Sequence, residues 1–261
     1  MLITGEARVG LLEDGDRVRV GVAAHSVRAV PAEVLTKIGE AAGERPLHVH
    51  LSEQPAENAA TQAFYGRTPT ELLDDHGLLG PRTTAVHATH LTDTDIKTLG
   101  GTQTSACFCP TTERDLADGI GPARRLADAG SPLTVGSDQQ AVIDPFEELR
   151  GLEMHERLAT GERGRFTPGD LIMIASADGY RSLGWADGGR IADGAPADFV
   201  VVRSDSVRTM GARPDQIAYA ASGADVDQVV VAGQRIVRDG QHQLGSPARL
   251  LERALDQLGA A

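Results

Sequence analysis

The feature that most constrains the fold of this chain is a regular alternation of apolar and helical segments between residues 17 and 160. The alternation predicts five strand–helix pairs. The expected strands are 17–25, 46–52, 83–90, 102–110 and 131–138, and the expected helices are 31–43, 55–77 with a break near Pro69, 92–100, 120–130 and 145–160. Such alternation is typical of a parallel sheet with right-handed crossovers, either closed into a barrel or open and doubly wound.

Polar residues at the ends of the expected strands favour the barrel. Four strands end at a histidine or an aspartate, namely His25, His50, His87 and Asp138. A barrel builds its active site from the carboxyl ends of its strands, whereas an open sheet binds its ligand near one switch point with a glycine-rich turn. The sequence contains neither G-x-G-x-x-G nor a Walker motif. We therefore expect a (β/α)8 TIM-type barrel; since a barrel needs eight strands, three are either missed or absent.

The chain after residue 186 has a different pattern. Short valine-rich segments, separated by glycine and aspartate turns, occur within 187–207 and 226–242 and predict antiparallel β structure. The segment 246–259 carries an apolar stripe and predicts a final amphipathic helix capped by Ser246. These residues therefore form a second layer or a small domain beside the barrel.

Composition limits the partners and the compartment. The formal net charge is −12, with 37 acidic and 25 basic residues, which argues against a nucleic-acid surface. No apolar run reaches the roughly 18 residues of a membrane span, and the first residues lack the layout of a signal peptide. The two cysteines, Cys107 and Cys109, are too close for a useful staple. We expect a cytoplasmic protein that binds neither nucleic acid nor membrane.

The stretch "HVHLSEQ" combines two imidazoles and a carboxylate at the end of an apolar segment. Alternate residues of a strand share a face, so His48 and His50 point the same way, and Glu53 follows in the loop. Imidazole nitrogen and carboxylate oxygen are suitable ligands for zinc or iron, and His87 and Asp138 end neighbouring strands. The spacings alone also fit a scattered set of structural histidines and acids.

Four motifs in this order resemble the amidohydrolase superfamily: "HVHLSEQ", "VHATHLTD", "CPTTERDLADG" and "GSDQQ" followed by "DPFEELR". Within it they look most like the formimidoylglutamate deiminases of histidine breakdown, whose fourth barrel strand is similar to "GVAAHSVRAV". "GRIADGAPADFVVV" and "VVVAGQRIVRDGQH" resemble the small β-sandwich of these enzymes. The resemblance implies about strands 4–8 of a metal-dependent hydrolase barrel in 1–186, part of the sandwich in 187–245, and a C-terminal helix in 246–261.

The resemblance also implies roles for individual residues. His50 and Asp138 would bind one divalent metal ion, zinc or alternatively iron. Glu53 would move protons to and from the substrate nitrogen, His87 would polarise the reacting carbon or steady the hydroxide, and Asp138 would accept the proton of the water. His25 and Arg28 would hold the carboxylates of a dicarboxylate substrate. The implied reaction is the hydrolysis of N-formimino-L-glutamate to N-formyl-L-glutamate and ammonia.

Two departures from the family pattern leave alternatives open. The family begins its barrel with a metal-binding H-x-H pair, but residues 1–24 contain no histidine, and Gln139 and Gln140 stand where a histidine often follows the aspartate. We therefore expect the carboxyl-terminal portion of such an enzyme, from a misplaced start, a split gene or a decayed copy. The chain would then be an inactive fragment or one that works only when paired, for example as a homodimer. A sister deaminase or chlorohydrolase acting on a heterocycle is a further alternative, although "HSVRA" suits an acid better.

Overall fold

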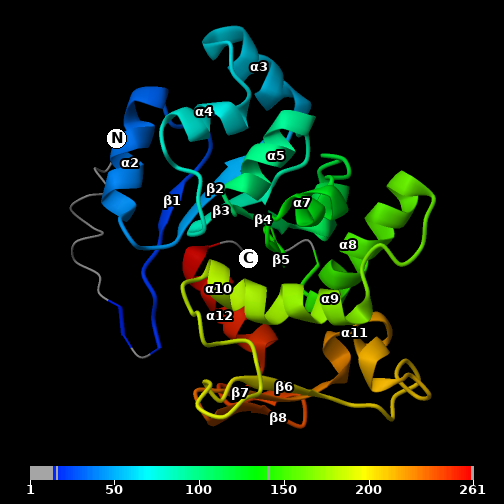
Figure 1. Cartoon of the computed structure of the whole chain (residues 1–261). Coiled ribbons are helices and arrows are strands. Elements are labelled where there is room, and N and C mark those ends of the chain that lie inside the picture. Colours follow the sequence, from blue (N-terminus) through cyan, green and yellow to red (C-terminus); the bar gives the residue numbers. More distant parts are fainter. Residues whose placement is uncertain (1–13, 16, 140–141, 260–261) are drawn as a thin grey trace.

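The computed structural model describes residues 14–15, 17–139 and 142–259 (Figure 1). Gln140, the first residues of the predicted barrel part and the last two residues of the predicted C-terminal helix lie outside the described residues. No helix within the described ranges combines the length and the apolar character needed to cross a bilayer.

Five parallel strands form the central sheet, and each pairs with the next one along the chain. The strands are β1 (Val22–Ala24), β2 (Leu47–Leu51), β3 (Thr83–His87), β4 (Ser105–Phe108) and β5 (Leu133–Val135). A doubly wound sheet reverses its strand order at a switch point, whereas sequential order is the order of a barrel wall. The predicted parallel α/β architecture, with sequential strand order, is confirmed.

Helices follow the strands and cover one side of the sheet (Figure 1). They are α2 (Ala32–Ala42), α3 (Pro55–Tyr65), α4 (Pro69–Asp75), α5 (Asp93–Gly101), α6 (Pro110–Asp115), α7 (Ala123–Ala129) and α8 (Pro145–Thr160). The start signals are local: Thr68 and Thr92 each form a capping box, and Pro69 sits at the first position of α4. The predicted break near Pro69 is therefore the start of a new helix.

The register of β2 decides which side chains reach the functional face. Its apolar residues Leu47, Val49 and Leu51 are buried in the core between the sheet and the helices. His48 and His50 alternate with them on the other face and are half-buried. A slip of one residue would bury both imidazoles among leucines, so the apolar packing fixes the direction of the histidines.

Glycine at position 100 lets α5 approach α7 closely. A Cβ built on Gly100 would lie 2.2 Å from the backbone oxygen of Ala129 in α7. The neighbouring Gly101 faces open space. The contact lies at the end of α5, near the loop that leads into β4 at the amino end of the sheet.

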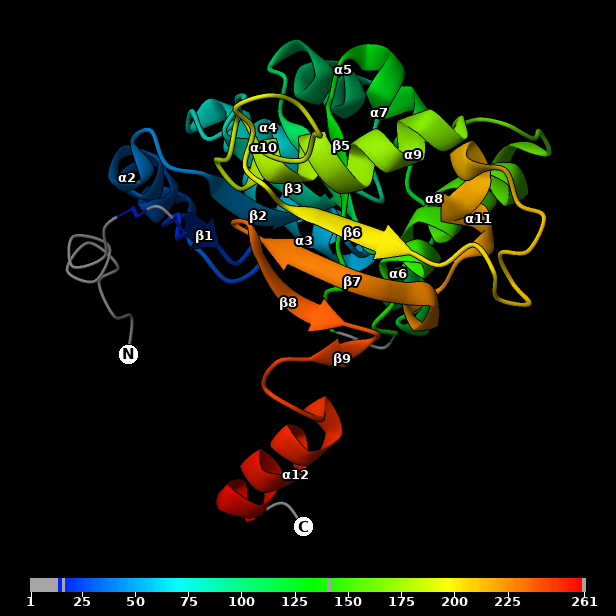
Figure 2. The same cartoon turned by 90° about the horizontal axis from the view of Figure 1, so that it is seen from below.

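The rest of the chain forms a helical segment, an antiparallel sheet and a final helix. The helical elements are α9 (Pro168–Met173), the π-helical turn η1 (Ile174–Asp178), α10 (Gly179–Ser182), η2 (Pro214–Gln216), α11 (Ile217–Ala220), η3 (Gly223–Asp225) and α12 (Pro247–Leu258). The antiparallel strands, in sheet order, are β6 (Phe199–Val202), β7 (Val226–Val231), β8 (Gln234–Arg238) and β9 (Gln241–His242). Ser246 caps α12 as expected, and this helix extends away from the two sheets (Figure 2). The domain boundaries at 186/187 and 245/246 stay a prediction.

Several expected elements differ in extent. The strand expected at 17–25 is only β1, and the one expected at 102–110 stops at Phe108 because Pro110 starts α6. The strand expected at 83–90 ends at His87, whose φ of 70° cannot continue a strand. Of the strands expected in 187–207 only β6 forms. Helices α6 and α9–α10 were not predicted.

Candidate functional site

Three of the predicted site residues meet at the carboxyl ends of the parallel strands. His50 lies in β2, His87 ends β3, and Asp138 follows β5. One ligand atom from each of the three lies within 4.8 Å of the others. The site residues that the sequence pattern placed at one rim of the sheet are therefore close together in space.

The backbone orients the His50 ring. Its Nδ1 lies 2.7 Å from the carbonyl oxygen of His25, and a carbonyl only accepts, so Nδ1 carries the proton. Nε2 is then the unprotonated ring nitrogen, available as a metal ligand. The ring is stacked on that of His87 with centroids 5.5 Å apart, and the exposed His25 ring is tilted against it with centroids 5.0 Å apart.

His87 is fully buried and surrounded by carboxylates. Its Nδ1 lies 3.4 Å from Glu113 Oε1, and its Nε2 lies 3.9 Å from Glu53 Oε1 and 4.0 Å from Asp138 Oδ2. Burial alone would lower the pKa of His87, but the hydrogen bond and charge of Glu113, with the charges of Glu53 and Asp138, raise it above its usual value. Within the described residues Nε2 has no hydrogen-bond partner.

These donor atoms fit a divalent metal ion. Histidine ligands of metals characteristically donate their second ring N–H to a carbonyl or a carboxylate, as His50 and His87 do here. The unpartnered Nε2 of His87 and the carboxylate of Asp138, whose side chain is 29% exposed, complete a nitrogen and oxygen set typical of zinc or iron. The structure thus adds His87 as a candidate ligand beside His50 and Asp138, the two that the resemblance implied.

Strained backbone surrounds the cluster. Ser52, His87 and Asp138 have positive φ values of 48°, 70° and 47°. Such conformations cost about 1–3 kcal/mol each in a residue other than glycine and persist only where the surroundings hold them. All three lie where β2, β3 and β5 turn into their loops, so the strain coincides with the cluster.

Glu53 is held by an ion pair rather than lying free. A guanidinium nitrogen of Arg28 binds Glu53 Oε2, and Arg28 Nε lies 3.7 Å from Glu57 Oε2. Glu57 also accepts the backbone N–H of Glu53 at 3.0 Å. Burial raises the pKa of Glu57, and Arg28 partly offsets that effect. Arg28, expected to hold a substrate carboxylate, is thus paired with two acids and keeps 31% of its side chain exposed.

Two other residues that the sequence analysis singled out, Gln139 and His48, form hydrogen bonds with distant parts of the chain. Gln139, which follows the aspartate, donates to Asp115 at 2.6 Å. His48 forms a hydrogen bond with the carbonyl oxygen of Ser182, so it is a satisfied histidine on the same face as His50.

The sequence interpretation missed two buried acids that support the cluster, Glu57 and Glu113. Both lie early in a helix that follows a strand, where a carboxylate can accept backbone N–H groups. Glu57 stands four residues after Glu53, and Glu113 lies within "CPTTERDLADG", so their positions near strand ends were a usable signal.

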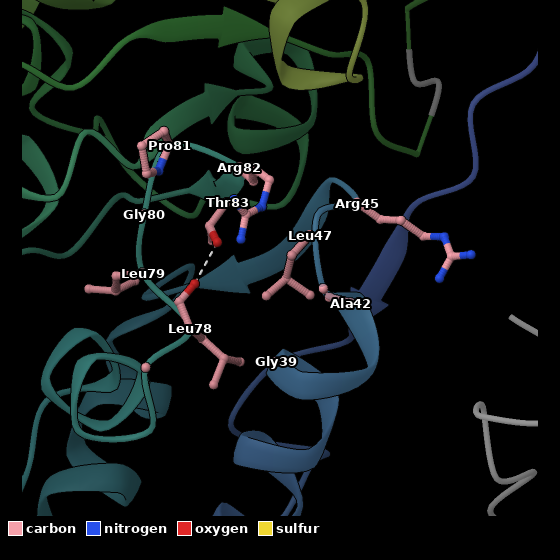
Figure 3. Close-up of a pocket in the computed structure, with 12 residues that line it drawn as sticks. Gly39, Ala42, Arg45, Leu47, Leu78, Leu79, Gly80, Pro81, Arg82 and Thr83 are labelled. Carbon is pink, nitrogen blue, oxygen red and sulfur yellow. Dashed lines mark hydrogen bonds between the residues drawn. The ribbon is translucent and has the colours of Figure 1, made fainter. Parts of the chain in front are cut away.

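A separate cavity lies at the opposite end of the strands. It has a volume of about 150 Å³ and is lined by the end of α2, the start of β2 and the loop before β3 (Figure 3). Glycines and leucines dominate this lining, together with Arg45 and Arg82. Thr83 donates to the carbonyl oxygen of Leu78 there, which ties the loop to the strand. The cavity shares no lining residue with the His50, His87 and Asp138 cluster.

Comparison with known proteins decides the family. Residues 1–236 match the sequence model described as Amidohydrolase family. The chain belongs to the amidohydrolase family. This amidohydrolase is 32% identical over 246 residues to a 5'-deoxyadenosine deaminase from Methanothermobacter thermautotrophicus, covering 92% of this chain and 57% of the relative. It is 33% identical over 235 residues to a formimidoylglutamate deiminase from Pseudomonas aeruginosa, covering 85% and 52%.

A solved structure agrees with the fold. An adenosine deaminase from Xanthomonas campestris with bound zinc superposes with a TM-score of 0.88 at 26% identity, over 96% of this chain and 60% of that one. The chain thus spans about half the length of the curated relatives it matches. Deaminases of several substrates are similar to it to nearly the same degree.

Proposed function

We propose that this chain carries the metal-binding and proton-transfer residues of a hydrolase that releases ammonia from N-formimino-L-glutamate. The observation that carries the proposal is the convergence of His50, His87 and Asp138, with the unpartnered Nε2 of His87 beside two carboxylates. The similarity to the formimidoylglutamate deiminase supports the substrate, and the zinc-bound deaminase supports zinc, with iron as the alternative. Two free thiols support a reducing, cytoplasmic setting for this step of histidine breakdown.

A divalent ion bound by His50, His87 and Asp138 would supply Lewis acidity that activates a water molecule for attack. Asp138 accepts the proton that this water loses, because its carboxylate lies at the open side of the cluster. The water oxygen bonds to the formimino carbon. His87 Nε2, held beside the carboxylates of Glu53 and Asp138, carries a lone pair, so in this proposal His87 would act as a metal ligand and not as a hydrogen-bond donor to the attacking oxygen.

Glu53 completes the reaction as a proton carrier: its carboxylate takes up the hydroxyl proton of the tetrahedral intermediate and passes it to the terminal nitrogen, which also receives the proton held by Asp138. The carbon–nitrogen bond breaks only after the terminal nitrogen is protonated, so that ammonia leaves and N-formyl-L-glutamate remains. Arg28 and Glu57 fix the position of Glu53 from the side away from His87, through the ion pair and the backbone N–H. General acid–base catalysis of this kind contributes about 100- to 10,000-fold in rate.

His25 and Arg28 remain the proposed contacts of the substrate carboxylates. His25 is exposed beside His50, and the Arg28 side chain, which binds Glu53, is 31% exposed. A carboxylate that binds Arg28 shares the guanidinium with Glu53 and Glu57, so substrate binding and the position of the proton carrier are coupled.

Ammonia release from N-formimino-L-glutamate, with zinc and then with ferrous iron, tests the proposal. We expect turnover by the wild-type chain and at least a 100-fold loss in E53Q, with Glu71→Gln as the control because Glu71 only caps α4. Bound metal with no turnover of any substrate would reject the activity of this chain. Turnover unchanged in E53Q would reject the assigned role of Glu53.

A sister deaminase of a heterocycle is the second candidate, and two observations favour it. The 5'-deoxyadenosine deaminase is about as similar to this chain as the deiminase is. The pairing of Arg28 with Glu53 and Glu57 leaves little free positive charge for a dicarboxylate. Faster ammonia release from 5'-deoxyadenosine or guanine than from N-formimino-L-glutamate would replace the first candidate.

A site completed by pairing is the third candidate. Among the described residues β1 and β5 each pair with one strand only, so they are the two edge strands of the parallel sheet. We propose a homodimer as the partner consistent with these edges. Native mass spectrometry tests it: a dimer with activity that rises with chain concentration supports pairing, and a monomer with full activity excludes it.

A further inference from the structure

Glu113 is a buried acid that contacts His87 from the side away from the cluster. It is 1% exposed and lies in α6, the short helix after β4. Its Oε1 accepts the backbone N–H of Cys109 at 2.7 Å and lies 3.4 Å from His87 Nδ1. One carboxylate oxygen therefore links the start of α6 to the ring of His87.

The chemistry of the two groups determines which His87 nitrogen carries the proton. Glu113 Oε1 already accepts the backbone N–H of Cys109, and a carboxylate oxygen accepts hydrogen bonds, so His87 Nδ1 is the donor to Glu113. In the neutral ring Nε2 is then unprotonated, and it is the atom that lies 3.9 Å from Glu53 and 4.0 Å from Asp138. Which imidazole nitrogen is available to a metal or a substrate is generally set by the hydrogen bond of the other nitrogen.

We propose that Glu113 is a positioning residue that holds His87 in the Nδ1–H tautomer and so presents Nε2 to the site. The proposal rests on the proposed use of His87 in the site, although its test needs no turnover. The positive φ of His87 restricts the side-chain rotamers that its ring can adopt. The hydrogen bond to Glu113 determines which ring nitrogen carries the proton. The Nδ1–H of His50 is held in the same way by the carbonyl oxygen of His25, so both histidines have Nε2 as the unprotonated nitrogen.

The competing explanation is that Glu113 only caps α6. Glu148 offers a matched control, because it is 2% exposed and binds the backbone N–H and hydroxyl of Thr111 in the same helix. It forms no hydrogen bond with His87. Loss of either carboxylate leaves a buried N–H at the start of α6 unpaired, whereas only loss of Glu113 changes His87.

The experiment is nitrogen NMR of the histidine rings in the metal-free full chain, at a pH above the titration of His87. Wild type, Glu113→Met, Glu113→Gln and Glu148→Met are compared. We expect Nδ1–H in wild type and in E148M, loss of that preference in E113M, and its recovery in E113Q, whose side-chain oxygen can accept both contacts. Zinc titration of the same proteins should show affinity about 10- to 100-fold weaker in E113M only.

If His87 in the wild-type chain carries its proton on Nε2, the proposal is wrong. This measurement needs no variant, so the proposal can be tested even if E113M does not fold. Equal loss of zinc affinity in E113M and E148M would reduce Glu113 to a helix cap. A wild-type chain with the Nδ1–H tautomer but no ammonia release would contradict the proposed function while leaving the role of Glu113 intact.

Discussion

At the carboxyl ends of the parallel strands, two imidazoles and Asp138 converge and the backbone of His87 and Asp138 takes positive φ values. At the amino ends, the chain instead encloses a cavity of about 150 Å³ between α2 and the loop before β3, lined mostly by glycine and leucine (Figure 3). Hydrogen bonds such as Thr83 to Leu78 close that end locally.

The difference separates residues that we propose to bind a metal ion from residues that stabilise the fold. The carboxyl end keeps an unpartnered ring nitrogen, clustered carboxylates and strained backbone, all of which oppose folding. The amino end lies beside the close contact of α5 with α7. Substitutions at the carboxyl end should therefore change ligand binding more than stability, and those at the amino end the reverse.

The largest effect expected is on metal affinity. Asp138→Asn should weaken zinc binding by more than about 100-fold, because even losing a group that orients a ligand costs 10- to 100-fold. Stability should change by less than about 0.5 kcal/mol, since Asp138 is partly exposed and Asn tolerates a positive φ. Isothermal titration with zinc and urea unfolding measure the two quantities. Asp115→Asn, on the same rim, is the control and should leave zinc affinity and stability unchanged. A wild-type zinc affinity in D138N would contradict the assignment of the carboxyl end to ligand binding.

A second test adds a methyl group near the amino end. Gly100→Ala should lower the free energy of unfolding by about 1–3 kcal/mol, because the new Cβ would meet the Ala129 carbonyl at 2.2 Å. Gly101→Ala, one residue on with open space around it, should be neutral or stabilising by up to about 1 kcal/mol. Urea unfolding measures both. Zinc affinity should stay at the wild-type value in each variant, and a loss in G100A would show that the two ends are coupled.

A third test removes one hydrogen bond at the amino end. Thr83→Val should lower the free energy of unfolding by about 1 kcal/mol, since the buried hydroxyl no longer donates to Leu78. The next residue is a matched control: the hydroxyl of Thr84 is equally buried but has no hydrogen-bond partner among the described residues. Thr84→Val should therefore be neutral or stabilising. Equal destabilisation of the two variants would contradict this account of the loop.

The smallest effect concerns pH and a residue that belongs to neither end. Burial, with a further contribution from Arg114, lowers the pKa of His155 in α8 below its model-peptide value of 6.5. The unfolded chain therefore binds more protons than the folded one as the pH falls below about 6.5, and stability falls with it. His155→Gln should flatten this part of the stability curve and leave stability at pH 8 close to wild type. Thermal unfolding between pH 5 and 8 measures it; an unchanged curve would contradict the assignment.

Much of the parallel sheet could be predicted because its signals are local. Apolar runs, threonine and proline at helix starts, and polar strand ends marked the strands and helices, and in a parallel sheet such ends share one edge. His50, His87 and Asp138 were therefore predictable as neighbours. Helix α6 was missed because it is only six residues long and its first residue, Pro110, was assigned to the end of the preceding strand.

The rest depends on tertiary packing that no local pattern encodes. Whether Arg28 faces solvent or the carboxylates of Glu53 and Glu57 depends on how the loop after β1 packs against α3. The contact between Glu113 and His87 joins residues 26 apart in the chain. That His87 is a candidate metal ligand likewise became visible only when its distance to Asp138 was known.

X-ray absorption at the zinc edge of the chain loaded with one equivalent of zinc tests the central claim most directly, that His50, His87 and Asp138 bind one ion together. The account predicts nitrogen and oxygen neighbours at about 2.0–2.2 Å, with the multiple scattering of two imidazole rings and no sulfur. A sulfur shell at about 2.3 Å, as Cys107 and Cys109 would give, or scattering from fewer than two imidazoles, would contradict it.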